Sequence, residues 1–524
     1  MCGITVLFTN ISTNTSNPKT TCIQHRGPDE HVIHKRSHDV WIFDRLSIND
    51  VTFGSQPFIQ DEHIMICNGE IYNHKDIGEG KSLSDCEPLF HRLRTLPCYD
   101  DTHVSTLCNE LDAEFAFVYA NSFYYVIARD PLGVRPLFYA MDDKFPDMVI
   151  GVSSEAKMLM ENCSNVSKIQ QFPPGHCWLL DIFGNILYHK KYVPELNPKA
   201  FINMDDSTSI CKQIHDRLTK AVEKRLMSDR PIGFFLSGGL DSSIIASIGA
   251  KLMHPKQITT YSIGTKGYES PDLIAAKQMA EYLNTNHIVV EFTIEEAFEQ
   301  LRNVIWHLES YDCTTIRASV PMYLLCNKIK QMGLHQVLLS GEGADELFGG
   351  YLYLHNAPSN ADFQQETLRL LQDVHEYDLV RADRCTAAHG LELRVPFFDK
   401  ALVDYVISLD PSVKRSKTIE KKILRDAFTN ELPNEIVNRQ KNGMSDAVGY
   451  SWVDALKEFT QKTQQDTNFQ KYSINTPISD EEMYYRQVYH ELFGNRVITH
   501  RNIWRPRWTR IMDPSARQLN VFNS

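Results

Sequence analysis

The sequence changes its hydrophobic pattern once, near residue 200, and this change constrains the fold more than any other feature. Beyond about residue 205, short apolar runs such as Ile232–Leu236 and Ile258–Ile263 alternate with segments of helical periodicity. One such segment begins with Ser270-Pro271-Asp272, which combines a hydroxyl cap, a proline at the first helical position and an acid. Strands that alternate with helices pair in parallel, because each helix carries the chain back across the sheet. This part is therefore predicted to be an α/β domain that becomes mostly helical after about residue 360.

The part before residue 195 is predicted to be a β-rich α+β domain. Its short runs are rich in aromatic and β-branched residues, and Asp, Asn and Gly separate them. The predicted strands are Trp41–Ile48, His63–Tyr72, Phe115–Ala120, Phe123–Ala128, Pro136–Ala140 and Met148–Val152. Ser84-Asp85-Cys86-Glu87 has the spacing of a capping box and predicts a helix toward Leu93. The proline-containing stretch 193–207 predicts a linker, so we expect domains at residues 1–195 and 205–524.

Charge and composition exclude several classes of protein. Lys and Arg number 54 against 66 Asp and Glu, and the net charge of −12 disfavours nucleic acids and anionic membranes as partners. No apolar run is long enough to span a membrane. The 12 cysteines include no CxxC pair, and the first residues lack the pattern of a secretory signal. We therefore expect a cytoplasmic protein without disulfides or zinc ribbons.

A glycine-rich turn follows the strand Ile232–Leu236. Residues 237–243 read SGGLDSS, and a helical segment comes directly after them. Glycines at a strand-to-helix turn let the backbone approach a ligand, and the free amides at the start of a helix bind phosphate. A Walker A loop is excluded, because no Gly-Lys-Ser/Thr follows. In this context SGGLDSS resembles the pyrophosphate-binding loop of ATP pyrophosphatases.

A second loop, SGEGADELFGGY at residues 340–351, follows the short strand Gln336–Leu339. Ligands of open parallel sheets bind at the carboxyl ends of the strands, where both loops are expected to lie. Asp241 and Asp345 can then hold Mg²⁺ together, since this hard cation prefers oxygen ligands and bridges to phosphates. Glu342 and Glu346 add carboxylates to the same edge.

Cys2 is the second candidate catalytic feature of the sequence. The side chain that follows the initiator methionine is small, so we expect Met1 to be removed and the amine of Cys2 to become free. A terminal amine has a reference pKa near 8 and a thiol near 8.5. One residue thus supplies a nucleophile and its own general base.

Polar residues elsewhere in the first domain can complete a site around Cys2. Arg45 offers a guanidinium for a substrate carboxylate, and Asp85 can accept from a substrate ammonium. Asn68, Gly69 and Glu70 form the segment NGE, whose amide and backbone donors can stabilise an oxyanion.

Twelve ordered motifs extend these interpretations over essentially the whole chain. They are MCGI, HRGPD, RLSIND, NGEIYNH, SDCE, RDPLGVRPL, FPPG, SGGLDSS, TTIRAS, SGEGADELFGGY, GLELRVPFFD and EKKILR. Together they resemble the glutamine-hydrolysing asparagine synthetases. The resemblance implies an N-terminal-nucleophile hydrolase sandwich of αββα layers, followed by a parallel-sheet ATP-pyrophosphatase domain with a mostly helical C-terminal part.

The resemblance also implies a reaction. L-Aspartate is converted to L-asparagine with ammonia from L-glutamine, at the expense of ATP and with Mg²⁺. The reaction passes through β-aspartyl-AMP and releases AMP, pyrophosphate and glutamate. The implied partners are thus glutamine, aspartate and ATP, and the sequence leaves open whether the chain forms a homodimer.

Motif by motif, the resemblance assigns roles in the first domain. Cys2 is similar to the nucleophile that forms a glutamyl thioester, and Asn68 and Gly69 to the oxyanion hole. Arg45 and Asp85 are similar to the residues that bind the α-carboxylate and α-ammonium of glutamine. The implied glutamine-binding residues are Arg45, Leu46, Ser47, Ile48, Asn49, Asn68, Gly69, Glu70 and Asp85.

In the second domain the resemblance implies an ATP site and catalytic residues. Asp241 and Asp345 resemble the Mg²⁺ ligands, Glu342 the residue needed for the aspartyl-adenylate step, and Lys421 a lysine that stabilises developing negative charge. The implied ATP-binding residues are Leu236, Ser237, Gly238, Gly239, Asp241, Ser242, Ser243, Ile263, Ser340 and Gly341. The residues implied in the aspartate and pyrophosphate environment are Thr314, Thr315 and Arg317.

The chain departs from the family pattern at three places. Ala344 stands where Ser is expected, and Ala113 where Gly is usual. The Thr/Asn/Ser-rich segment Thr9–Thr21 is shorter than in relatives, which affects the rim of the glutamine pocket.

Three other functions stay open at this point. They are a glutaminase with an inactive second domain, a non-catalytic sensor of amino acids or nucleotides, and a related ligase that amidates another carboxylate. SGGLDSS with Asp345 argues against the first, and Cys2 with Asn68 against the second. TTIRAS and the matching C-terminal half favour aspartate by resemblance.

Overall fold

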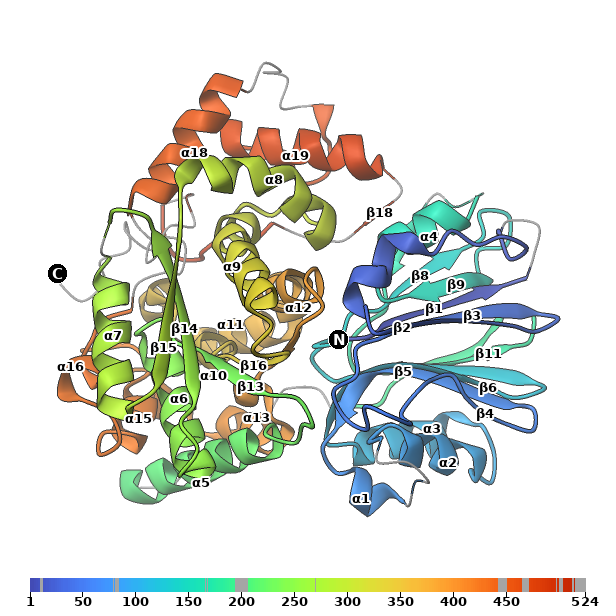
Figure 1. Cartoon of the computed structure of the whole chain (residues 1–524), viewed down its shortest axis with the longest axis horizontal. Helices are drawn as coiled ribbons and strands as arrows, with labels where there is room; N and C mark the ends of the chain where they lie inside the picture. The colour runs from blue at the N-terminus through green and yellow to red at the C-terminus, as the bar shows by residue number, and fades with distance from the viewer. Residues whose placement is uncertain are drawn as a thin grey trace.

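The two predicted parts form separate sheet systems in the computed structural model (Figure 1). The structure describes residues 1–9, 13–78, 80, 84–164, 166, 168–193, 206–268, 270–441, 450–463, 471–495, 497–498, 503–510 and 513. Most of the predicted linker and part of the segment Thr9–Thr21 lie outside this range. No helix among the described residues is long and apolar enough to cross a bilayer.

The first part contains two sheets whose strands are antiparallel except at one edge. In spatial order the first sheet contains β18 (Val497–Ile498), β10 (Ile169–Gln171), β8 (Phe138–Met141), β9 (Val149–Ser153), β1 (Gly3–Phe8), β3 (Asp39–Arg45) and β2 (Glu30–Lys35). The second contains β12 (Ile186–Lys191), β11 (His176–Asp181), β7 (Tyr124–Arg129), β6 (Ala113–Ala120), β5 (His63–Ile71) and β4 (Phe58–Gln60). The six strands predicted here are therefore confirmed, with shifts of one to three residues at their ends.

Alternating side chains explain the layers of this domain. Val6 and Trp41 of the first sheet pack on Ile66 and Val118 of the second, so that an apolar core lies between the sheets. The opposite face of the second sheet is covered by α2 (Glu87–Arg94) and α3 (Asp101–Glu110), and that of the first by α4 (Ala156–Asn162) and the 3₁₀ helix η1 (Thr21–Arg26). The short α1 (His74–Ile77) follows β5. The predicted αββα sandwich is confirmed.

The second part is built on a five-stranded parallel sheet. Its order is β15 (Asn286–Phe292), β14 (Thr259–Thr265), β13 (Ile232–Phe235), β16 (Val337–Leu339) and β17 (Glu392–Arg394). The chain proceeds from β13 outward to β15 and then returns to the other side of β13. The strand order therefore reverses between β13 and β16, and the loops after these two strands open at this topological switch point.

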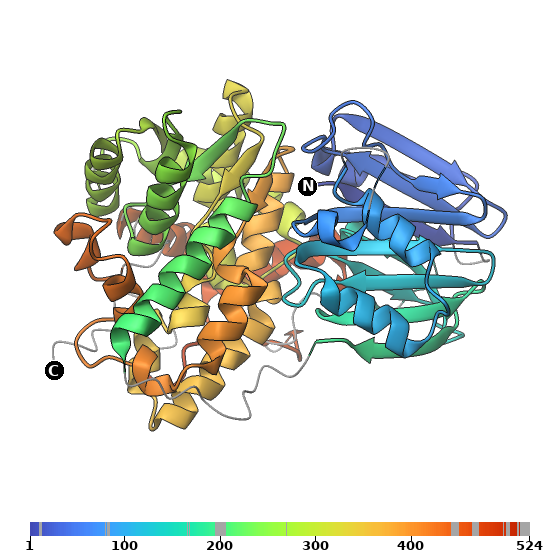
Figure 2. The same ribbon diagram turned by 90° about the horizontal axis from the view of Figure 1, so that it is seen from below.

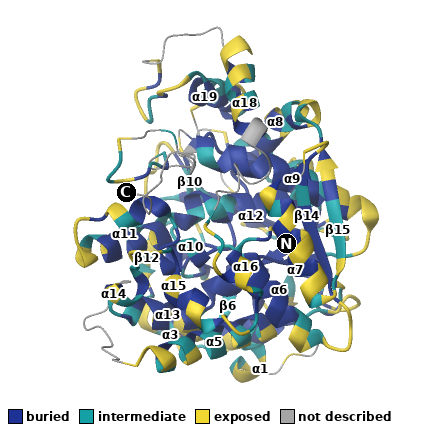
Figure 3. Ribbon diagram, turned by 90° about the vertical axis from the view of Figure 1, so that its left-hand side faces the viewer, coloured by how far each residue is buried: buried dark blue, intermediate teal, exposed yellow. Residues whose placement is uncertain are grey.

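Helices cover the parallel sheet and then form the C-terminal region (Figure 2). The covering helices are α5 (Ser207–Lys224), α6 (Leu240–Met253), α7 (Pro271–Leu283), α8 (Ile294–Leu308), α9 (Cys313–Met332) and α10 (Ala344–Phe348). Later helices are η2 (Leu352–Asn356), α11 (Asn360–Asp373), η3 (Val374–Glu376), α12 (Asp378–Ala387), η4 (Pro396–Phe398), α13 (Lys400–Ser408), α14 (Pro411–Lys414), α15 (Lys422–Ala427), α16 (Asn434–Val437), α18 (Tyr450–Thr463) and α19 (Asp480–Phe493). Figure 3 shows α9 and α12 as largely buried helices, in agreement with their burial along nearly the whole length.

Two local predictions have different outcomes. Ser270 caps α7, because its side chain accepts from the backbone N–H of Leu273 at 3.2 Å, as expected. The helix predicted toward Leu93 is confirmed as α2, but the capping box at residues 84–87 is wrong, because α2 begins after Cys86, whose side chain makes no cap hydrogen bond. Asp85 in this segment is used elsewhere, since its Oδ2 accepts from the N–H of Ile71 at 2.7 Å.

The C-terminal region contributes to the first sheet. β18 pairs in parallel with β10, although its residues fall in the predicted second domain. The boundary predicted at residues 195–205 thus separates the two parts along the sequence only. In space, a strand from the end of the second part forms one edge of the first sheet.

Buried ion pairs join the two domains at two places. At the first, Arg26 Nη1 lies 2.8 Å from Glu155 in its own domain and 2.8 Å from Asp383 in the other. At the second, Arg225 lies 3.0 Å from Glu114. All these side chains are less than 5% exposed. The relative position of the domains is therefore specified by charges that cannot be left unpaired.

We expect Arg26→Met to destabilise the protein strongly. Loss of the guanidinium leaves Asp383 and Glu155 without this cation in a buried place, which costs about 3–5 kcal/mol of unfolding free energy. Urea denaturation measures the change. Lys19→Met is the control, because Lys19 pairs with Glu161 on the surface and its loss should leave the unfolding free energy nearly unchanged. Equal effects of the two substitutions would contradict the prediction.

Candidate functional site

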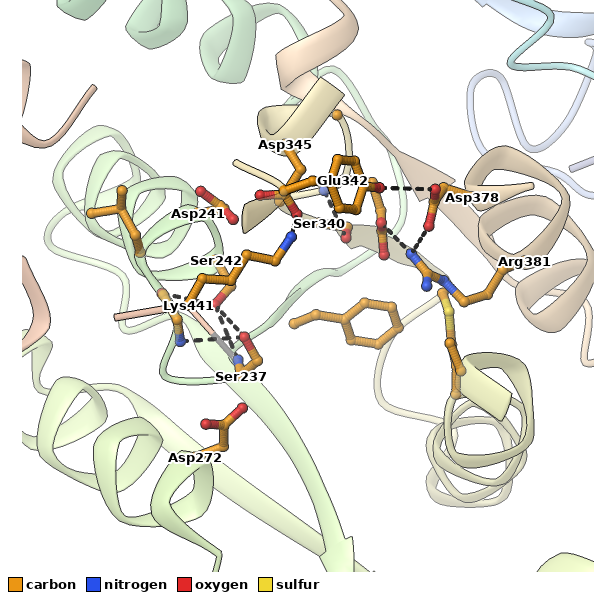
Figure 4. Close-up of a pocket in the computed structure, with 18 of the residues that line it drawn as sticks. Ser237, Asp241, Ser242, Asp272, Ser340, Glu342, Asp345, Asp378, Arg381 and Lys441 are labelled. Carbon is orange, nitrogen blue, oxygen red and sulfur yellow. Dashed lines mark hydrogen bonds and ion pairs between the residues drawn. The ribbon is translucent and has the colours of Figure 1, made fainter. Parts of the chain in front are cut away.

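A cavity of about 280 Å³ opens at the switch point of the parallel sheet (Figure 4). The loop after β13 and the loop after β16 form two of its walls, and residues near the start of α15 form another. The two loops lie against each other because residue 341 is glycine. A Cβ at Gly341 would lie 2.7 Å from the backbone N of Ser242 and 2.8 Å from the carbonyl carbon of Asp241.

The loop after β13 has the geometry of a phosphate cradle. Gly238 has φ +75°, which only glycine adopts without strain. Ser242 Oγ accepts from the backbone N–H of Ser237 at 3.1 Å, and the two hydroxyls are 3.0 Å apart. α6 begins at this point, so its free N–H groups and the positive end of its dipole face the cavity.

A lysine bridges the two loops. Lys421 Nζ lies 2.7 Å from Asp241 Oδ2 and 2.8 Å from Asp345 Oδ1. Lys441 Nζ also contacts Asp345, through its other carboxylate oxygen, and Figure 4 shows Lys441 extending toward it. Lys421 is 2% exposed, so this cluster of opposite charges is enclosed.

The charges of this cluster are set by their partners. Burial by itself would lower the pKa of Lys421, but Asp241 and Asp345 hold it above the ordinary value. Burial opposes ionisation of Asp345 too, yet Lys421 and Lys441 together hold the pKa of this carboxyl well below its usual range. Burial raises the pKa of Asp241, and Lys421, its ion-pair partner among the described residues, opposes this shift. Asp345 is therefore the more firmly ionised of the two carboxylates.

Asp241 and Asp345 fit a divalent cation. Both carboxylates approach one point, where Lys421 Nζ lies within 2.8 Å of each. Two carboxylates that converge in this way match the oxygen ligands of Mg²⁺, which completes its coordination with phosphate oxygens and water.

A second polar group lies across the cavity. Glu342 contacts Arg381, and Arg381 lies 2.9 Å from Asp378 (Figure 4). Burial raises the pKa of Glu342, and Arg381 opposes this shift. Thr314 lines the same cavity, and its Oγ1 is buried without a hydrogen-bond partner among the described residues. These groups are available to a polar substrate.

The cavity brings together most residues predicted for the second domain. The predicted residues that line it are Leu236, Ser237, Gly239, Asp241, Ser242, Ile263, Thr314, Thr315, Ser340, Gly341, Glu342, Asp345 and Lys421. Gly238 and Ser243 do not line it. Gly238 packs on α7, and Ser243 is fully buried one turn inside α6.

The placement expected for Arg317 needs a correction. Its guanidinium lies 2.6 Å from Glu481 and 2.8 Å from Asp513, away from the cavity, although Thr314 and Thr315 on the same helix line it. Arg317 is two positions from Thr315 and therefore faces another side of α9, where the carboxylates of Glu481 and Asp513 hold its guanidinium in a buried place.

Cys2 lies at the boundary of the two domains, near the marked N-terminus in Figure 1. Its Sγ accepts from the N–H of Leu46 at 3.4 Å, and its carbonyl accepts from Arg26 Nε at 3.0 Å. Burial raises the pKa of the thiol to about 11. Met1 is 1% exposed, and burial lowers the pKa of its amine to about 6, although Glu392 lies 3.9 Å away.

Asn68 carries one of the unsatisfied buried donors of the first domain. It is 1% exposed, and its Nδ2 has no hydrogen-bond partner among the described residues. A buried amide N–H without a partner costs free energy unless a ligand uses it. Gly69 follows, and a Cβ there would lie 2.5 Å from the carbonyl oxygen of Glu114. The position predicted for an oxyanion hole thus carries a free donor.

The residues predicted to bind glutamine form a connected set. Asn49 Nδ2 donates to Glu70 at 2.7 Å and to Asp85 at 3.4 Å. Arg45 contacts the carbonyl of Asp50 in the same loop. The N–H of Ser47 donates to Asp29 at 2.8 Å. Leu46 and Ile48 are buried and complete the loop.

Several residues of these sites were not predicted. Arg26 lies in the motif HRGPD, to which the sequence pattern assigned no function, and its Nε donates to the carbonyl of Cys2. Arg439 donates to the carbonyl of Gly238 at 2.9 Å and contacts Asp272, while Lys441 contacts Asp345. The basic stretch that contains Arg439 and Lys441 was the only signal in the sequence, and its partners lie far away along the chain.

Two family models match consecutive parts of the chain. A model of the glutamine amidotransferase domain matches residues 1–177, and a model of asparagine synthase matches residues 213–364 and 356–519. The chain is 38% identical to a probable glutamine-hydrolyzing asparagine synthetase of Dictyostelium discoideum, with 100% of both chains covered. It is 36% identical to the glutamine-hydrolyzing asparagine synthetase B of Escherichia coli, over 96% of this chain and 95% of that one.

We expect Gly341→Ala to separate the two cavity loops. The new Cβ meets backbone atoms that belong to the other loop, and such overpacking typically costs about 1–3 kcal/mol, so binding of ATP should weaken about tenfold. Calorimetric titration with ATP measures this change. Gly78→Ala is the control, because a methyl group at that position would meet no atom within 4 Å. Unchanged binding by Gly341→Ala would contradict the close approach of the loops.

Proposed function

Because the chain belongs to the glutamine-hydrolysing asparagine synthetases, we propose that it amidates L-aspartate in two half-reactions that are joined by ammonia. The enzyme is a carbon–nitrogen ligase that uses glutamine as amido donor. The proposal adds the residues and steps: glutamine is hydrolysed at Cys2, and aspartate is activated with ATP in the cavity of the parallel sheet. The observation that carries it is the bridge of Lys421 between Asp241 and Asp345, at the meeting point of the two loops.

In the first half-reaction Cys2 Sγ attacks the carboxamide carbon of glutamine. Removal of Met1 would leave the α-amine on Cys2, where it can take the thiol proton and pass it to the leaving nitrogen. The C–N bond then breaks, ammonia departs, and water hydrolyses the glutamyl thioester to glutamate. The high pKa of the buried thiol supports the need for such a base.

The negative charge of this step develops on the carboxamide oxygen. The unpartnered Nδ2 of Asn68 and the backbone at Gly69 are proposed to donate to it. Arg45 would bind the α-carboxylate and Asp85 the α-ammonium, while Leu46, Ser47, Ile48, Asn49 and Glu70 shape the pocket between them.

In the second half-reaction the β-carboxylate of aspartate attacks the α-phosphorus of ATP. The bond to pyrophosphate breaks, and β-aspartyl-AMP forms. The nucleoside would lie against Leu236 and Ile263, with the phosphates on the loop that begins at Ser237. Asp241 and Asp345 would hold Mg²⁺, which neutralises charge on the phosphates when bound. Lys421 supplies a further positive charge beside the departing pyrophosphate.

Ammonia then attacks the activated carbonyl carbon and expels AMP. Glu342 is proposed to accept the proton that nitrogen loses, because its carboxylate lines the cavity beside Arg381. Thr314 and Thr315 would contact aspartate or pyrophosphate. The proposal gives Arg317 no contact with substrate, because it is paired on the other side of α9.

We expect Cys2→Ala to abolish glutamine-dependent synthesis while synthesis from ammonium chloride persists, because the two half-reactions have separate sites. The assay supplies aspartate, Mg-ATP and either nitrogen source, and mass spectrometry identifies asparagine, AMP, pyrophosphate and glutamate. Cys22→Ala, at a half-buried thiol of the same domain, is the control and should keep both activities. Wild-type protein that forms glutamate without asparagine and AMP would overturn the proposed function.

We expect Lys421→Met to lower asparagine formation by a factor of about 10²–10³, which is typical for loss of one preorganised electrostatic contact. Glutaminase activity should remain. Lys422→Met is the matched control, because this neighbouring lysine is exposed and pairs with Asp426. The measurement is the turnover number of both variants. Wild-type turnover of Lys421→Met would show that Lys421 has no catalytic role.

A further inference from the structure

One short strand of the second domain contacts both sites. β17 is three residues long and lies at the edge of the parallel sheet, beside β16. The carbonyl of Arg394 accepts from the N–H of Ser340 at 3.2 Å, at the start of the cavity loop. The side chain of Arg394 points toward the first domain. Its Nη2 lies 3.0 Å from Oε2 of Glu70, one of the residues predicted to bind glutamine.

The guanidinium of Arg394 is held from several sides. It is fully buried, with 0% exposure. Nε donates to Glu392 at 2.8 Å, and Nη1 donates to the carbonyl of Arg225 at 2.9 Å and contacts the carbonyl of Met227. These three partners fix the plane of the guanidinium, so that Nη2, which forms an ion pair with Glu70, has little freedom to move away from it.

Glu70 depends on this cation. It is 3% exposed, and burial raises its pKa well above the ordinary value, while Arg394 is the strongest group that opposes the shift. Glu392 and Asp85 are nearby carboxylates that add to the rise. Without Arg394, Glu70 would take up a proton or turn away, and its bond with Asn49 at 2.7 Å would change with it.

We propose that Arg394 is a positioning residue for glutamine: it holds Glu70, and through Glu70 the Asn49 side chain beside Asp85, so that a strand of the synthetase domain completes the glutamine pocket. The inference rests on the proposed function, because it assigns glutamine to this pocket. It extends that function, since the affinity of one domain for its substrate then depends on a residue of the other.

Other arginines at the interface cannot replace Arg394. Arg135 lies 3.1 Å from Glu114, and its other nitrogen donates to the carbonyl of Leu393 at 3.3 Å. Arg225 is committed to Glu114 and Asp399, each at 3.0 Å. A lysine at position 394 would keep a positive charge but would lack the planar fork that reaches four partners.

The test is Arg394→Lys in the full-length enzyme. The KM for glutamine should rise about tenfold, while kcat at saturating glutamine and synthesis from ammonium chloride change less than about twofold. The ammonium reaction should survive, because the variant keeps the main-chain carbonyl that accepts from Ser340. Arg384→Lys is the matched control: Arg384 is equally buried in the interface and pairs with Glu155 and Glu309, away from Glu70. It should leave the KM for glutamine unchanged.

If Arg394→Lys does not fold, a second pair of variants tests the proposal. Glu70→Gln and Glu70→Gln/Arg394→Met are compared, since the double variant removes both charges of the pair. If Arg394 acts through Glu70, the two have the same KM for glutamine. A further rise in the double variant would overturn the proposal.

Two other results would also overturn it: a folded Arg394→Lys with wild-type KM, or an equal rise in Arg384→Lys, which would show a general loosening of the interface. Failure of the proposed function itself looks different, because wild-type protein would then form no asparagine from either nitrogen source.

Discussion

Buried ion pairs across the domain interface are the contacts on which the rest of this structure depends. Arg26 reaches Asp383, Arg384 reaches Glu155, and Arg394 reaches Glu70, all with exposures of a few per cent. Such pairs add little net stability, because desolvation offsets most of the attraction, but an unpaired member is very costly. They therefore penalise any other arrangement of the two domains. The chain obtains a unique interface from them, and with it a fixed relation between Cys2 and the cavity of the parallel sheet.

The cavity has its own constraint, which comes from topology. The strand order reverses between β13 and β16, so the loops after both strands must meet, and Gly341 lets their backbones touch. Asp241 and Asp345 arrive from different loops and would repel each other in this enclosed place. Lys421 offsets the repulsion between the two carboxylates, because its ammonium lies within 2.8 Å of both. In the proposed reaction cation and phosphates take over part of this compensation, so the same three residues serve both states.

The sequence allowed prediction of features that depend on local pattern. The parallel sheet follows from alternating strands and helices, and the Ser270 cap from three consecutive residues. Most of the residues that line the cavity could be named because they sit directly after strands, where topology brings them together. What could not be predicted depends on distant partners: Arg26 meets Asp383 across 357 positions, and β18 joins a sheet of the other domain. Arg317 was misplaced because a motif gives residue types but not the face of the helix, which Glu481 and Asp513 decide. The capping box failed because α2 begins at Glu87, with Cys86 rather than Ser84 at the cap position.

The proposed transfer of ammonia adds a requirement that the interface charges meet. Neutral ammonia is the nucleophile, whereas ammonium has no lone pair and does not react. An unpaired buried carboxylate would attract the positive charge of ammonium and so shift the equilibrium toward the protonated form. Seven buried acidic side chains at or near the domain boundary are paired with an arginine. These carboxylates are Glu70, Glu114, Glu155, Glu309, Asp383, Glu392 and Asp399. Because arginine stays protonated at any physiological pH, it compensates them permanently, which a histidine would not do. Arginine fixes the domains relative to each other, and in the proposed reaction it would also keep the domain boundary from retaining ammonium.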